Sequence, residues 1–148
     1  MYTYFKSKDE LIRATVLEEQ NTALAAHNEP CSGSFFDRLC KQVVSCISDV
    51  GYPVTHNLWI EIMAESARNP ELREAFIASD NIMRQSIAGI IAQGIAAGEF
   101  RRDINPQAIT IILFAFIDGL IARKAINPAF SLETDVPAFP DLMSKLLK

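Results

Sequence analysis

Few side chains in this sequence have the chemistry of an enzyme or a metal site. The chain has three cysteines and two histidines, and none of them forms a CxxC or HExxH pattern. Such patterns hold metal ligands, or a nucleophile and its base, at workable distances. The sequence also lacks a glycine-rich loop of the kind that cradles a phosphate. We therefore expect no catalysis, no metal ion and no cofactor.

The cysteines indicate a reducing environment. Cys31, Cys40 and Cys46 are odd in number, which argues against a disulfide framework. Cys40 and Cys46 resemble small apolar residues of a helix. No signal peptide precedes the first expected helix. These features favour a cytoplasmic protein.

A different set of side chains could line a pocket for a small, mostly apolar molecule. Trp59 and Met63 are four residues apart and share a helix face, as do Phe36 and Cys40. Aromatic rings and adaptable methionines are typical of such pockets, although ordinary core packing is the alternative for each residue. The predicted pocket residues are Phe36, Cys40, Trp59, Met63, Met83, Phe114 and Asp118.

Asp118 interrupts an otherwise apolar run, AITIILFAFIDGLIA, at residues 108–122. A carboxylate that is buried without a partner is costly, so Asp118 needs one. An N–H group of the fold, an arginine across a dimer or a donor on a ligand would serve, and we favour a structural hydrogen bond. The run is about 15 residues long, whereas a membrane span needs about 20. We therefore interpret it as a buried helix and expect no membrane insertion.

Helical periodicity and start signals place these residues on about six helices. Ser7 and Glu10 form a capping box, and Asn69-Pro70 and Asn105-Pro106 are the same start signal used twice. No segment alternates like a strand. The sequence predicts an all-α helical bundle, with helices near residues 8–26, 34–50, 58–69, 70–97 and 106–123 and a last one at the C-terminus.

The helix over 106–123 is apolar on every side, whereas a surface helix has one apolar stripe. Such a helix occupies the centre of its fold or is covered by a second copy of the chain. Gly119 costs about 1 kcal/mol in a helix interior, which is easier to explain if another backbone comes close. Together with the C-terminal helix it would form a two-fold, four-helix interface. The predicted homodimer contacts are Ile109, Ile112, Phe116, Gly119, Phe139, Met143 and Leu146.

Composition limits the number of domains and the kinds of partner that the chain can bind. The chain has 148 residues, of which 49% are hydrophobic and 22% are charged, as in a single soluble domain with a real core. Its net charge of −4 makes it a poor binder of polyanions such as DNA.

The run YTYFKSKDEL at residues 2–11 resembles the end of the DNA-binding region in the tetracycline-repressor (TetR) family of transcription factors. In that family an aromatic segment ends the recognition helix, and after a tight turn the next helix opens with Ser/Asn-Lys-x-x-Leu. The runs EIMAESARNPELREAF, GIAAGEFRRDINP and LFAFIDGL resemble the family's regulatory domain. The resemblance implies a recognition-helix remnant over residues 1–6 and a ligand-binding and dimerisation domain over residues 7–148.

The same resemblance implies roles in the intact protein. Tyr2 and Tyr4 would contact the backbone of operator DNA, and Lys8 would meet a phosphate near a helix N-terminus. Most of the helix-turn-helix is missing from this chain, so we expect the fragment not to read DNA. The family further implies a homodimer and a small-molecule effector. The alternative is a helical dimerisation module without a ligand.

Overall fold

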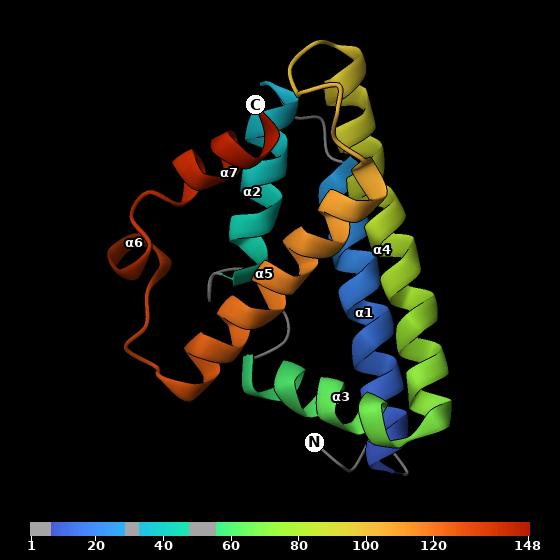
Figure 1. Ribbon diagram of the computed structural model, residues 1–148. Coiled ribbons are helices and arrows are strands. Elements are labelled where there is room, and N and C mark those ends of the chain that lie inside the picture. Colours follow the sequence, from blue (N-terminus) through green and yellow to red (C-terminus); the bar gives the residue numbers. More distant parts are fainter. Residues whose placement is uncertain (1–6, 29–32, 48–55) are drawn as a thin grey trace.

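The computed structural model describes residues 7–28, 33–47 and 56–148, and their regular structure is entirely helical (Figure 1). Within these ranges the helices are α1 (Lys8–Asn28), α2 (Phe35–Ile47), α3 (His56–Arg68), α4 (Pro70–Ala96), α5 (Pro106–Ile126), α6 (Leu132–Asp135) and α7 (Phe139–Leu147). The predicted all-α fold is confirmed. None of these helices combines the length and the apolar run that a membrane span requires.

Local sequence fixes where three of the helices begin. The Ser7 hydroxyl oxygen accepts a hydrogen bond from the backbone N–H of Glu10 at 3.2 Å, as the capping box predicts. Asn69 Oδ1 accepts from the backbone N–H groups two and three residues on, at 3.0 and 3.4 Å. Asn105 does the same at the start of α5, at 3.0 and 3.2 Å. Each proline after an asparagine removes an N–H that the helix itself could not satisfy.

Helix α4 is the scaffold of the bundle. It contacts α1, α2, α3 and α5, and α1 lies alongside it (Figure 1). Helix α5 crosses the bundle diagonally, and α3 lies across the end where α4 begins (Figure 1). The short helix α6 lies in the linker between α5 and α7 (Figure 1), and its Leu132 packs against the apolar core.

The apolar interior is divided into two clusters. The first core joins α2, α4, α5 and α7, and its buried residues are Leu39, Val43, Ile47, Ile87, Ile90, Ile91, Phe100, Ile109, Leu113, Phe139, Met143 and Leu147. The second core joins α1, α3, α4 and α5, and its buried residues are Ile12, Val16, Trp59, Ile62, Leu72 and Ile121. Ile117 of α5 packs against both cores, so α5 connects the two halves of the interior.

The largest differences from the sequence-based prediction are the end of α5 and one short helix that was not predicted. Helix α5 continues to Ile126, beyond the predicted end at residue 123. Past that end, the Lys124 ammonium group donates to the carbonyl oxygens of Pro128 and Phe130, at 3.0 and 2.9 Å, and holds the start of the linker against the helix. Helix α6 was not predicted, because four residues are too few for a periodic signal. The predicted end of the second helix at residue 50 lies outside the described residues.

A glycine permits the tight return of the chain from α4 towards α5. The carbonyl oxygen of Gly94 accepts hydrogen bonds from the backbone N–H groups of Glu99 and Phe100, at 2.9 and 3.2 Å. The buried Phe100 ring lies directly over Gly94, and a Cβ atom there would be 2.3 Å from the ring. The Phe100 ring therefore leaves no room for a side chain at position 94.

We expect Gly94→Ala to lower the free energy of unfolding by about 1–3 kcal/mol, because the Phe100 ring must leave its site in the first core. Gly89→Ala is the matched control on the same helix, because nothing lies within 4 Å of the place that its new methyl group would take. It should raise the free energy of unfolding by about 0.5–1 kcal/mol through helix propensity. Urea denaturation followed by circular dichroism measures both values, and equal stability of the two variants would contradict the packing argument.

Candidate functional site

Trp59 of α3 and Asp118 of α5 are joined across the bundle. The indole Nε1–H donates a hydrogen bond to Asp118 Oδ1 at 3.3 Å. The indole ring also packs against Phe76 of α4, with ring centroids 5.7 Å apart and planes tilted by 40°. The structural hydrogen bond that the sequence favoured for Asp118 is thus present, and three helices meet around it.

The surroundings of the Asp118 carboxyl group disfavour its ionised form. Burial raises its pKa from 3.8 to about 6, the hydrogen bond from Trp59 opposes that rise, and the nearby carboxylate of Asp80 adds to it. Asp80 itself pairs with Arg84, whose Nε lies 2.8 Å from Asp80 Oδ2. Among the described residues no lysine or arginine forms an ion pair with Asp118. A buried acid with so little compensation is a candidate for a functional role.

The remaining predicted pocket residues divide between the two cores. Met63 packs against the second core, to which Trp59 belongs. Phe36, Cys40 and Phe114 pack against the first core instead. Met83 is half-buried on α4. The structure therefore gathers Trp59, Met63 and Asp118, whereas Phe36, Cys40 and Phe114 lie along the first core and Met83 belongs to neither core.

Cys40 behaves as a small apolar residue. Burial raises the pKa of its thiol, the Asp37 carboxylate raises it further, and the Lys148 ammonium lowers it. The thiol is free and half-buried. Because the thiolate is the reactive form, a raised pKa keeps Cys40 unreactive at neutral pH.

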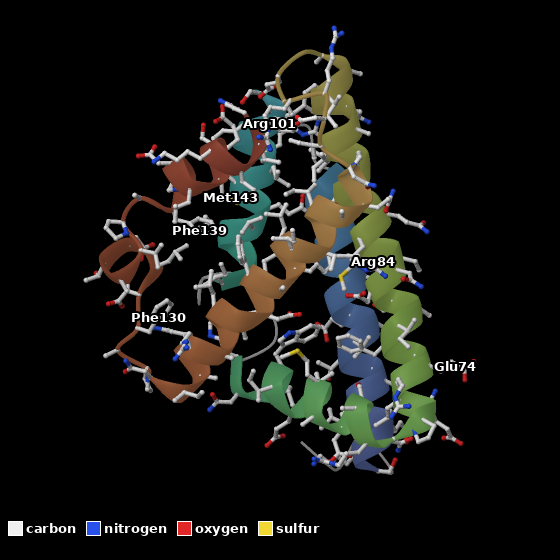
Figure 2. All side chains as sticks on the ribbon, in the orientation of Figure 1. Glu74, Arg84, Arg101, Phe130, Phe139 and Met143 are labelled. Carbon is white, nitrogen blue, oxygen red and sulfur yellow. The ribbon has the colours of Figure 1, made fainter. Side chains whose placement is uncertain are left out.

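A second feature is an open apolar groove of about 340 Å³ between α5 and α7. Phe139 and Met143 extend from α7 on the side that faces α5 (Figure 2). The groove is lined by Ala115, Phe116, Gly119, Leu120, Arg123, Val136, Phe139, Leu142, Met143 and Leu146. Five of the seven predicted dimer contacts are in this lining, and Arg123 is its one charged residue.

The groove and the adjacent face of α5 leave large apolar side chains in solvent. The exposed fraction is 43% for Ile112, 46% for Phe116 and 55% for Leu142. Ile109, Phe139 and Met143, in contrast, are buried within the core of their own chain. Leu142 was not among the predicted dimer contacts, although it adjoins Met143 on the apolar face of the same short helix. No atom lies within 4 Å of a Cβ position built on Gly119, so this part of the surface is open.

The turn after α4 holds two helices of the first core, at the end of α7 and at the start of α2. The backbone N–H and the guanidinium group of Arg101 donate to the carbonyl oxygens of Leu147 and Leu146, at 2.9 and 3.0 Å, and close the end of α7 (Figure 2). The Glu99 carboxylate accepts from the first two backbone N–H groups of α2, at 3.1 and 2.9 Å. Neither anchor was predicted, because each joins segments distant in the sequence.

The predicted DNA contacts can be placed only in part. Tyr2 and Tyr4 lie outside the described residues. Lys8 is at the first position of α1, and its ammonium group lies 3.5 Å from the Glu65 carboxylate of α3. Its side chain remains about half exposed, so this ion pair is a weak surface contact.

The fold matches solved structures of transcriptional regulators. It superposes with a TM-score of 0.81 on a protein assigned to the TetR family from Rhodococcus sp., at 25% identity, over 99% of this chain and 79% of that one. It superposes with a TM-score of 0.72 on Salmonella enterica GusR, at 26% identity, over 98% of this chain and 73% of GusR. These similarities define the class of the protein as a helical transcriptional regulator.

Sequence comparison defines the family. Residues 38–136 match the C-terminal region of BetI-type transcriptional repressors. The transcriptional regulator UidR of Escherichia coli K12 is 30% identical over 129 residues, which cover 82% of this chain and 62% of UidR. The chain therefore belongs to the TetR family of transcriptional regulators, as the resemblance at residues 2–11 implied. It spans somewhat less than two thirds of the length of UidR.

The raised pKa of Asp118 predicts a pH-dependent stability. A folded-state pKa of about 6, above the ordinary 3.8, means that the contribution of Asp118 is most favourable below pH 3.8 and is lost as the pH rises through about 6. Asp118→Asn keeps an acceptor for Trp59 but cannot ionise. We expect this variant to gain up to about 3 kcal/mol over the parent chain between about pH 4 and about pH 7.

Urea denaturation across that pH range measures the difference. Glu74→Gln is the matched control, because Glu74 is exposed and points away from the bundle (Figure 2). A difference between Asp118→Asn and the parent chain that stays constant with pH would contradict the assignment.

Proposed function

We propose that this chain is the regulatory part of a TetR-family repressor, which senses a small, mostly apolar molecule and forms a homodimer. In this proposal residues 7–148 are the regulatory domain. The intact protein binds operator DNA with Tyr2, Tyr4 and Lys8 among its contacts, and the fragment alone does not read DNA. One observation carries the proposal. On one side of α5, Asp118 is hydrogen-bonded to Trp59, and on another side α5 lines the exposed apolar groove.

The case for dimerisation rests on the apolar surface of α5 and α7. Contiguous exposed apolar side chains on a soluble domain mark an interaction site, because leaving them in water is unfavourable. A two-fold axis beside the groove would let the same two helices of each copy cover those of the other. Gly119 would then be the point where the two α5 backbones pass closest, since nothing in its own chain occupies that space.

The case for ligand sensing rests on the surroundings of Asp118. An isolated structural role would favour a neutral side chain at this position, because the buried charge lowers stability. Trp59 and Phe76 supply flat apolar surface, and the half-buried Met63 supplies a side chain that adapts to shape. Apolar walls with a few oriented polar groups are typical of small-molecule sites.

A substitution at Gly119 tests the dimer. We expect Gly119→Leu to weaken the dimer by at least about tenfold, or about 1.4 kcal/mol, because the new side chain fills the crossing point. Leucine has better helix propensity than glycine, its Cβ atom would meet nothing within 4 Å, and Gly119 is exposed, so the fold should remain intact. Sedimentation velocity gives the dissociation constant. Gly89→Leu, on α4 away from the groove, is the control and should leave the dimer unchanged. A monomeric parent chain would refute the dimer proposal.

A compound screen distinguishes the sensor from a dimerisation module without a ligand. Trp59 is the only tryptophan of the chain, so intrinsic fluorescence reports directly on the proposed site. We expect at least one compound of a broad apolar set to change this fluorescence saturably and to raise the melting temperature. The same compound should bind less tightly to Asp118→Asn. A dimer that responds to none of the compounds would favour the module without a ligand.

A further inference from the structure

Asp118 has acceptor capacity that its own chain leaves unused. An ionised carboxylate offers about four acceptor positions. The Trp59 indole N–H occupies one of them, on Oδ1, and no other described residue donates to this carboxylate. Asp118 is half-buried, so its own chain does not fully enclose the remaining acceptor positions.

The charges around this acceptor disfavour an anion. Asp80 on α4 is close enough to act on Asp118 electrostatically. The neighbouring cation, Arg84, lies midway along α4 (Figure 2) and is committed to Asp80 at 2.8 Å and to Asn81 by a second hydrogen bond. Two carboxylates and one engaged guanidinium leave a net negative charge, which a positively charged group would neutralise.

An aromatic ring of α4 packs against Trp59, and the same helix carries a buried hydroxyl without a hydrogen-bond partner. The rings of Trp59 and Phe76 form a tilted pair 5.7 Å apart. Ser79 follows Phe76 by three residues and therefore lies on the same face of α4. Its side chain is 5% exposed, and its hydroxyl oxygen has no hydrogen-bond partner among the described residues. A buried hydroxyl without a partner is costly, so a polar group that reached it would be stabilised.

We propose that the effector is an organic amine, whose protonated nitrogen donates a hydrogen bond to Asp118 while its apolar body lies against Trp59 and Phe76. A charge-assisted hydrogen bond to a partly desolvated carboxylate is strong, and an aromatic face attracts a cation. The proposal rests on the proposed sensing function and narrows its ligand to one chemical class.

Matched probes test the class of ligand. The probes are phenethylamine and its longer-chain homologues, together with the alcohols and carboxylates of the same carbon skeletons. We expect the amines to change Trp59 fluorescence saturably and to bind at least about tenfold more tightly than the matched alcohols and carboxylates. Amine affinity should fall as the pH drops through about 6, because Asp118 then takes up a proton.

Two variants connect the response to Asp118. Asp118→Asn should lose at least about tenfold in amine affinity, since the charge partner is gone while an acceptor remains. Glu74→Gln, which removes an exposed charge on the outer side of α4, should bind amines as the parent chain does (Figure 2). Circular dichroism melting curves establish that both variants are folded.

Each result is decisive for one of the two proposals. Tighter binding of the alcohols or the carboxylates, with the same Trp59 response, would overturn the amine class and leave ligand sensing intact. Unchanged amine affinity in Asp118→Asn would also overturn it. No response to any of the three series would overturn the amine class as well, whereas the broader compound screen decides separately whether the chain senses a ligand.

Discussion

The structure depends on how a helix that is apolar on every side is kept from water. Within the described residues α5 is covered by α2, α3 and α4, and it takes part in both cores through Ile117. This arrangement still leaves Ile112 and Phe116 close to half exposed. Apolar burial is the main source of stability in a domain of this size, so covering these side chains would be favourable.

The division of the interior into two cores gives α5 a second role. Near its middle, α5 contacts the second core and the Trp59–Asp118 hydrogen bond, while neighbouring residues of the same helix line the groove. Asp118 and the groove therefore lie on the same helix, and no chain of flexible contacts stands between them. Coupling between two sites requires a structural element that both sites share.

Local features of the fold could be predicted from the sequence, and contacts between distant segments could not. The capping residues Ser7, Asn69 and Asn105 place three helix starts to the residue, because their signals are complete within four positions. The pairing of Trp59 with Asp118 joins residues that are 59 positions apart. Helical periodicity shows that Phe36 and Trp59 each face inward, yet it does not show that they belong to different cores.

The anchoring by Glu99 and Arg101 bears on how this chain can vary in length. Surface turns between helices usually accept inserted residues, because nothing depends on their path. Here the turn between α4 and α5 holds the start of α2 and the end of α7, so an insertion would detach two helices at once. In the linker between α5 and α7, Leu132 and Val136 pack against the first core, so a fused tag or a natural length difference among relatives fits best at the exposed residues between them (Figure 1).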